Sequence, residues 1–172
     1  MMQGRVQIYT GDGKGKTTAA AGLAVRALGA GMRVFIGQFI KNRDSSEMAF
    51  LRAVSQDITI EQFGAGGFIK AEPTPEDIKA ARNGLKRLQG VLTGDDFDIV
   101  IADEANSALA ANVLGLDEIM MLLDTRPPSV ELVLTGRSAP PELLERADLV
   151  TEMREIRHYF NSGTPARRGI EF

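Results

Sequence analysis

The segment Thr10–Ala20, with the sequence TGDGKGKTTAA, restricts the possible folds more than any other part of the chain. The strand-like run VQIYT leads into it, and a helical pattern of small apolar residues follows it. A strand that enters a turn rich in glycine and lysine and leaves it as a helix is the context in which a phosphate-binding loop works. A plain turn of similar composition would not need that context. The segment therefore predicts a nucleotide-binding α/β fold.

Each part of this loop has a chemical role. Gly11, Gly13 and Gly15 let the backbone fold so that successive N–H groups face one concavity, which suits phosphate oxygens. The helix predicted to begin near Gly15 adds the positive end of its dipole. Lys16 would place a cation on the phosphates, and the Thr17 hydroxyl would ligate Mg²⁺. The ATP-binding candidates are Gly11, Asp12, Gly13, Lys14, Gly15, Lys16, Thr17 and Thr18.

The loop also departs from the usual pattern G-x-x-x-x-G-K-[ST]. Thr10 stands where the first glycine of that pattern would fall, and a loop counted from Gly11 is one residue short. Two interpretations follow from the residues alone. The loop is either an ordinary nucleotide-hydrolysing loop with one substitution, or a loop for a different reaction.

The rest of the chain alternates short β-branched runs with helical patterns, which favours a parallel sheet covered by helices. Runs such as IVIA and LVL are apolar without interruption, as is typical of strands buried on both faces. The predicted strands are Val6–Thr10, Arg33–Gln38, Ile58–Phe63, Asp98–Ala102 and Glu131–Thr135, with a further candidate at Leu149–Met153. We therefore expect one α/β domain over residues 1–172, with a mostly parallel sheet flanked by helices, of the phosphate-loop, RecA-like class.

Helices are predicted between these strands. The clearest has Thr74 as its N-cap and Pro75 at its first position, and apolar residues then recur at helical spacing from Ile78 to Leu92. The other predicted helices run over Leu116–Leu123 and from Pro140 to Ala147, and the irregular segments are Phe63–Pro75 and His158–Phe172.

Charged residues follow two of the predicted strands. Asp103 and Glu104 end the run IVIA, at the edge where open α/β sheets bind ligands. Such a pair holds Mg²⁺ because a hard cation prefers oxygen ligands, although an acid at this place can also simply cap the next helix. The spacing does not decide which of the two would contact the metal. Arg137 follows the run LVLTG and can either reach a triphosphate or form a surface salt bridge. Lys16 and Arg137 are the catalytic candidates.

The composition excludes several classes of function. The chain has no cysteine, which rules out disulfides, thiolate zinc sites and cysteine catalysis. A net charge of −3 gives no overall attraction to nucleic acid or to an anionic membrane. The longest apolar stretch, Ala19–Leu28, is too short to span a bilayer, and no signal peptide is visible. The only histidine, His158, is more typical of a structural role than of catalysis. We expect a cytoplasmic protein without nucleic-acid or membrane partners.

Several of these segments together resemble the ATP:corrinoid adenosyltransferases, the cob(I)yrinic acid a,c-diamide or cob(I)alamin adenosyltransferases of the phosphate-loop type. They are the long segment Tyr9–Lys41, the runs ADEAN and LTGR, and the closing RHYFNSGTPARRGIEF. The family's loop is T-G-[ND]-G-K-G-K-T-T, so Thr10 belongs to the pattern. The resemblance covers nearly the whole chain, in the expected order.

The resemblance implies a homodimer that transfers the 5′-deoxyadenosyl group of ATP to the cobalt(I) of a reduced corrinoid, cob(I)alamin or a cobyrinic acid derivative, with triphosphate as leaving group. A reductase would supply the electrons. The resemblance also implies that Gly11–Thr17 hold the triphosphate, that Thr17 and Glu104 ligate Mg²⁺, and that Arg137 contacts phosphate. Phe68 matches an aromatic residue of the family that lies against the corrin ring; packing of this side chain into the core is the alternative.

Two departures from the family pattern affect these expectations. Lys70 stands where the family has a tryptophan, which changes the packing expected on the corrinoid side. Some members carry an N-terminal extension that helps to cover the site, whereas this chain begins only a few residues before Val6. We therefore expect the cover to be absent or to be supplied by another segment.

Two other functions fit a phosphate loop. A kinase or ATPase would act at the γ-phosphate, with Asn106 or Glu104 orienting the attacking group. A chaperone or sensor would bind ATP and a corrinoid or protein without turnover. In the adenosyltransferase reaction, by contrast, cobalt(I) is itself the nucleophile, so the protein has to position the substrates and stabilise the leaving charge. Product analysis separates the three, since only adenosyl transfer releases intact triphosphate.

Overall fold

The computed structural model of the chain describes residues 3–43, 45–66 and 72–172. Within these residues, six strands form one sheet in the order β3-β2-β4-β5-β1-β6, and every neighbouring pair is parallel. The strands are β1 (Val6–Thr10), β2 (Val34–Phe39), β3 (Ile58–Phe63), β4 (Ile99–Asp103), β5 (Glu131–Thr135) and β6 (Leu149–Glu152). The predicted parallel α/β sheet is confirmed; β2 and β4 each begin and end one residue later than expected.

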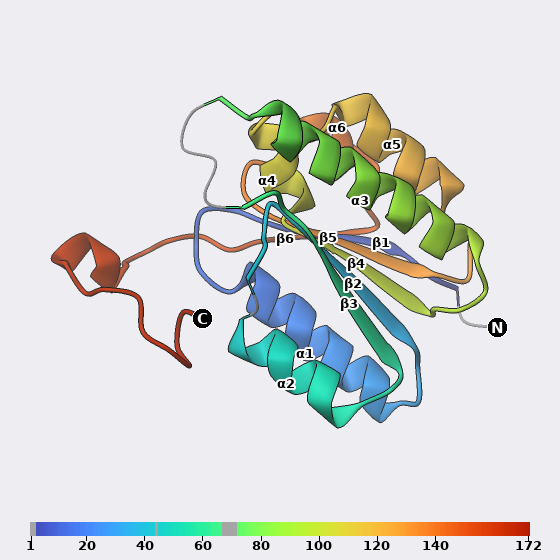
Figure 1. Ribbon diagram of the computed structural model, residues 1–172, viewed down its shortest axis with the longest axis horizontal. Helices are drawn as coiled ribbons and strands as arrows, with labels where there is room; N and C mark the ends of the chain where they lie inside the picture. Colours follow the sequence, from blue (N-terminus) through green and yellow to red (C-terminus); the bar gives the residue numbers. More distant parts are fainter. Residues whose placement is uncertain (1–2, 44, 67–71) are drawn as a thin grey trace.

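Helices cover both faces of the sheet (Figure 1). One face carries α1 (Lys16–Gly29) and α2 (Ser46–Val54), and the other carries α3 (Pro75–Thr93), α4 (Ala105–Ala110), α5 (Leu116–Thr125) and α6 (Pro141–Glu145). The sequence did not predict α2 or α4. The predicted start of α3 is confirmed, because the Thr74 side chain accepts a hydrogen bond from the Asp77 N–H while the Asp77 carboxylate accepts one from the Thr74 N–H.

The central strands contribute side chains to a separate core on each face of the sheet. In β2, Val34 and Ile36 pack into the cluster with α1 and α2, whereas Phe35 and Phe39 pack into the cluster with α3, α4 and α5. Successive residues of a strand point to opposite faces, so a strand covered on both sides needs apolar residues throughout. This is why the buried strands have uninterrupted apolar sequences.

The strand order determines which loops meet. Strand β5 lies between β1, which leads into the phosphate loop, and β4, which ends at Asp103. Because all strands are parallel, their carboxyl ends lie at one edge of the sheet. The chain then leaves β6 as a C-terminal arm, residues 153–172, which carries the short 3₁₀ helix η1 (Tyr159–Ser162) away from the helical layers (Figure 1). The candidate site lies at the carboxyl edge.

Candidate active site

The phosphate loop connects β1 to α1 through glycines in unusual conformations. Gly11 and Gly15 have φ angles of 95° and 117°, in the left-handed region that favours glycine. The Gly13 N–H donates to the carbonyl oxygen of Met153 at 2.7 Å, so one loop amide bonds the residue that follows β6. Two predicted loop residues, Asp12 and Thr18, have exposed side chains.

Lys16 lies over the loop. Its ammonium group donates to the carbonyl oxygens of Gly11 and Gly13, both at 2.7 Å, and its side chain is buried. Burial lowers the pKa of Lys16, and the nearby positive charge of Arg137 lowers it further. Lys16 and Arg137 thus place two positive charges in the same region of the site.

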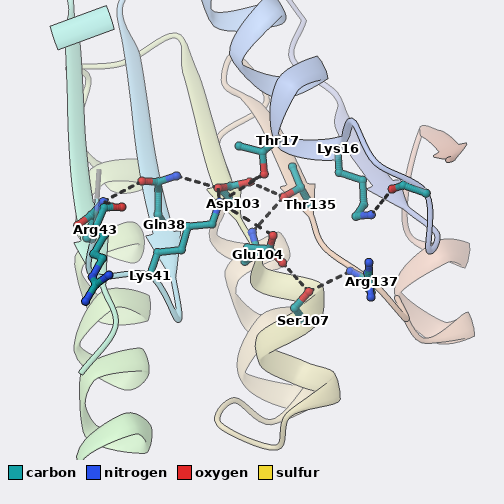
Figure 2. A network of polar contacts seen from close by, with 12 residues as sticks. Lys16, Thr17, Gln38, Lys41, Arg43, Asp103, Glu104, Ser107, Thr135 and Arg137 are labelled. Atoms are coloured by element: carbon teal, nitrogen blue, oxygen red, sulfur yellow. Dashed lines mark hydrogen bonds and ion pairs between the residues drawn. The ribbon is translucent and has the colours of Figure 1, made fainter. Parts of the chain in front are cut away.

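Asp103 is the centre of a polar network at the end of β4 (Figure 2). Its Oδ1 accepts hydrogen bonds from the hydroxyls of Thr17 at 2.8 Å and Thr135 at 2.7 Å. Its Oδ2 accepts from the Gln38 amide at 2.9 Å and from the Lys41 ammonium at 2.8 Å. A carboxylate offers about two acceptor positions on each oxygen. The protein thus fills all the acceptor positions of Asp103.

These partners keep Asp103 ionised in a fully buried position. Burial by itself would raise the pKa of Asp103, but the charge of Lys41 and the hydrogen bonds from Lys41, Thr135 and Gln38 outweigh it and lower that pKa. In the same way, burial acts against the charge of Lys41, and its ion pair with Asp103 outweighs this and raises the pKa of Lys41. The pair is a charged contact inside the site.

Glu104 has more capacity left for a ligand than Asp103. It has a φ of 61°, which is uncommon for a residue with a side chain, and its N–H donates to the Thr135 hydroxyl at 3.0 Å. Its Oε2 accepts from the Ser107 hydroxyl at 2.6 Å, and its Oε1 lies 4.0 Å from the Lys41 Nζ. The sequence did not decide which of the two acids would contact the metal. The structure favours Glu104, because this carboxylate can still accept a further partner.

Arg137 lies on the same side of the site as Lys16 (Figure 2). Its backbone N–H donates to the Ser107 hydroxyl at 3.0 Å, which connects the end of β5 to α4 and to Glu104. Its side chain is exposed, and with the described residues it forms no ion pair within 4.0 Å. The surface salt bridge considered from the sequence is therefore not formed within the described part of the chain.

The side chain of Lys14 does not face the same way as Lys16. Its Nζ donates to the C-terminal arm, to the Ile170 carbonyl at 2.7 Å, the Glu171 carboxylate at 3.0 Å and the Tyr159 hydroxyl at 3.2 Å. The hydrogen bonds to Tyr159 and Glu171 raise the pKa of Lys14. Two residues of the corrinoid-side expectation, Phe68 and Lys70, lie outside the described residues.

Sequence reasoning missed several residues of the network. Gln38 is fully buried in β2 and was counted only as the last residue of a predicted strand, and Lys41, just beyond that strand, was assigned no role. A glutamine inside a strand that is buried on both faces was the available signal, because a buried amide needs polar partners. Thr135 and Ser107 carried no comparable signal.

The donor set suits a hard cation that arrives with further ligands. The Thr17 hydroxyl donates its proton to Asp103, so its oxygen lone pairs remain able to face a cation, and Glu104 adds a carboxylate oxygen. Across the described ranges, no group of three or more His, Asp or Glu side chains is placed to hold a metal. Mg²⁺ characteristically takes few protein ligands and completes its shell with phosphate and water oxygens. The site fits such an arrangement.

Other features bear on the alternatives. Asn106, a candidate for orienting a group at the γ-phosphate, is fully buried, and its amide lies 3.4 Å from the Gly136 carbonyl. It therefore has no surface to present to an attacking water. In the described part of the chain, no helix is both long and apolar enough to cross a membrane.

Comparisons with known proteins agree with this geometry. A family model described as ATP:corrinoid adenosyltransferase BtuR/CobO/CobP matches residues 2–172. A corrinoid adenosyltransferase of Pseudomonas aeruginosa is 37% identical over 99% of this chain and 84% of its own length. One from Escherichia coli is 33% identical over 99% of this chain and 86% of its own length.

A comparison of folds gives the same class. The flagellar accessory protein FlaH of Methanocaldococcus jannaschii superposes with a TM-score of 0.58 at 15% identity, over 88% of this chain and 72% of that one. At this identity the likeness concerns the fold alone, and it confirms the predicted phosphate-loop, RecA-like class.

Proposed function

Because the chain belongs to the ATP:corrinoid adenosyltransferase family, we propose that its carboxyl-edge site holds the ATP whose 5′-deoxyadenosyl group the enzyme transfers to the cobalt(I) of a reduced corrinoid. Triphosphate is released, and the product serves adenosylcobalamin synthesis or salvage. One observation carries the assignment of the site. The cations Lys16 and Arg137 lie on one side of it, and the polar network of Asp103 lies on the other. Such an arrangement suits a polyphosphate.

The protein's own contribution to the reaction is positioning and charge stabilisation. The cobalt(I) electron pair forms the bond to the ribose C5′, and the C5′–O bond breaks with its electrons going to the triphosphate oxygen. Lys16, the loop amides of Gly11–Thr17 and Arg137 would stabilise that developing negative charge. Holding C5′ in line with cobalt lowers the barrier because the two substrates have already lost their relative translational and rotational freedom on binding.

The same residues indicate where Mg²⁺ would be held. Thr17 and Glu104 would supply its protein oxygens, and Asp103 would orient the Thr17 hydroxyl through their 2.8 Å hydrogen bond. When bound, the metal supplies positive charge to the phosphate oxygens. Asp103 would act on it through Thr17, since its acceptor positions are already filled by the protein.

The remaining parts of the proposal rest on the family. We include in it a corrinoid contact at Phe68, a homodimer, a separate reductase as electron donor, a single catalytic domain over residues 1–172 and a cytoplasmic location. The backbone of Lys14 belongs to the triphosphate cradle, while its side chain serves the C-terminal arm. Asp12 and Thr18 complete the cradle.

The test is a product analysis. The protein is supplied with ATP, Mg²⁺, a strong reductant and cobalamin, and the cobalt spectrum and triphosphate release are followed together. We expect an alkylcobalt spectrum and one triphosphate for each cobalt alkylated. Inorganic phosphate or ADP without alkylcobalt would mean that the site acts at the γ-phosphate, and ATP binding without any product would favour the sensor.

A pair of lysine variants locates the reaction at the loop. Lys16→Ala should abolish turnover and weaken ATP binding, because it removes the cation held over the loop carbonyls. Lys86→Ala removes an exposed lysine of α3, which lies on the other face of the sheet from α1, and should behave as the parent protein. Equal activity of the two variants would show that the loop does not hold the triphosphate.

A further inference from the structure

Lys41 is held at the site by an unusual backbone conformation. The residue before it, Ile40, has a φ of 50°, in a region that costs a β-branched side chain energy. This turn follows directly on β2, and Figure 2 shows the Lys41 side chain reaching from the end of that strand to Asp103. A strained residue that aims a cation into a site indicates that the position of the cation matters.

The Lys41 ammonium lies among the oxygens proposed to surround the metal. Its Nζ is 2.8 Å from Asp103 Oδ2, 3.4 Å from Thr17 Oγ1 and 4.0 Å from Glu104 Oε1. Lys16, by contrast, bonds the carbonyls of the loop. The two lysines therefore have different neighbours, and only Lys16 has the place usual for a phosphate-loop lysine.

The charges at this edge have a consequence for metal binding. Asp103 and Glu104 carry two negative charges, and Lys41 neutralises one of them from within contact distance. A divalent cation that arrived alone would lie beside the Lys41 ammonium when bound to Thr17 and Glu104. The two positive charges would repel each other, because charges about 4 Å apart interact strongly near a protein surface. A cation that arrives on ATP brings additional negative charge and the oxygen ligands that the protein does not supply.

We propose that Lys41 is a positioning residue that makes the site take its divalent cation only together with the triphosphate of ATP. It does so by fixing Asp103, and through Asp103 the Thr17 hydroxyl, and by repelling the free metal. This inference rests on the proposed function, because it takes Thr17 and Glu104 as the metal-binding side chains.

The experiment measures Mn²⁺ binding by electron paramagnetic resonance, which detects the free ion without any turnover. The parent protein without nucleotide should bind Mn²⁺ weakly. Lys41→Met keeps the length of the side chain but removes its positive charge. This variant should bind Mn²⁺ roughly tenfold more tightly or better, because one nearby positive charge has been removed. Lys41→Arg keeps the charge and should bind as weakly as the parent.

A second set of measurements covers the case in which Lys41→Met does not fold, since it leaves Asp103 buried without its ion pair. Lys41→Gln keeps a hydrogen-bond donor and should show the same gain. The double variant Lys41→Met with Asp103→Asn removes both charges and should lose most of the gain. If the nucleotide-free parent already binds Mn²⁺ as tightly as the uncharged variants, the proposal is wrong.

Adding adenylyl-imidodiphosphate separates this proposal from the function on which it rests. With this analogue both the parent and Lys41→Met should bind Mn²⁺ tightly, so that the difference between them shrinks. If the parent binds neither the analogue nor Mn²⁺ with it, the proposed function of the site fails. If the analogue binds but the uncharged variants gain no affinity for free Mn²⁺, only the role of Lys41 fails.

Discussion

The N–H of Gly13 in the phosphate loop donates a 2.7 Å hydrogen bond to the carbonyl oxygen of Met153, the first residue after β6. A Cβ placed on Gly13 would lie 2.7 Å from that same oxygen, and one placed on Gly11 would lie 2.4 Å from it. Both distances are far shorter than a carbon–oxygen contact allows. The loop and the C-terminal arm are therefore packed backbone against backbone, and this close approach requires glycine at both positions.

Gly13→Ala should destabilise the protein, because the new methyl group overlaps main-chain atoms that have no side-chain freedom to move away. We expect the free energy of unfolding to fall by about 1–3 kcal/mol, as for other overpacked sites. Gly22→Ala is the control, since it lies in α1 with open space around it and should gain up to about 1 kcal/mol from helix propensity. Urea unfolding of both variants checks this. Equal stabilities would mean that Met153 shifts without cost.

A second pair of glycines lies within α3 and tests how that helix packs on the sheet. A Cβ on Gly84 would lie 2.3 Å from the ring of Phe63 at the end of β3, whereas nothing lies within 4 Å of a Cβ on Gly90. Gly84→Ala should lower the free energy of unfolding by about 1–3 kcal/mol and Gly90→Ala should raise it by up to about 1 kcal/mol. Thermal unfolding gives both values. A stabilised Gly84→Ala would contradict the packing described.

The parts of the fold that the sequence predicted are those with strong local signals. The buried strands are marked by apolar runs, and α3 by Thr74 and Pro75 at its start. Helix α2 was missed because only Met48 and Leu51 of its residues are buried, which leaves little periodicity to detect. Helix α4 was missed because it has only six residues and begins directly after Glu104. Glu104 has a left-handed backbone conformation, which a glutamate in the sequence does not indicate.

The site was predicted only as far as chain order allowed. Asp103, Glu104 and Arg137 were predicted because each lies within two residues of the end of a recognisable strand. The contact of Lys41 with Asp103 requires β2 and β4 to be neighbours, which only the tertiary structure reveals, because they are not consecutive strands. The side chain of Lys14 could not be placed either, since its partners Tyr159 and Glu171 lie at the other end of the chain.

Acid should weaken the attachment of β6 to β1 through Asp148. Its carboxylate accepts hydrogen bonds from the Val6 N–H at 2.8 Å and the Arg5 guanidinium at 2.9 Å, and these bonds, that of Val6 first, lower the pKa of Asp148. A lowered pKa adds stability that is complete above the unfolded pKa of about 3.9 and is lost as the pH falls through the folded value.

Asp148→Asn should therefore cost stability at neutral pH and remove part of the loss seen in acid. Because the pair is exposed and screened, we expect a cost of about 0.2–1 kcal/mol at pH 7 that shrinks as the pH falls below the unfolded pKa and through the lowered folded pKa of Asp148. Denaturant unfolding from pH 7 to pH 2.5 measures this, with Asp96→Asn at an exposed turn as control for the loss of one carboxyl group. A cost that stays constant with pH would exclude a titrating contact.

The attachment of the arm to the loop through Lys14 and Glu171 should control how readily the arm opens. Glu171 also accepts hydrogen bonds from the Tyr159 hydroxyl and from the Arg167 N–H, and these partners, that of Tyr159 first, hold its pKa well below the usual range. Glu171→Gln removes the charge that all three partners share. We expect the rate of chymotrypsin cleavage after Tyr159 or Phe160 to rise about two- to fivefold, since exposed contacts of this kind are individually weak.

A double-mutant cycle shows whether Lys14 and Glu171 act together. Lys14→Met should accelerate cleavage by a similar factor, and the double variant should be cleaved little faster than either single variant, because both remove the same contact. Glu145→Gln, at an exposed position of α6, controls for loss of a carboxylate. If the cleavage rate of the double variant rises by the product of the two single-variant factors, Lys14 and Glu171 hold the arm independently. The arm would then not be attached through this ion pair.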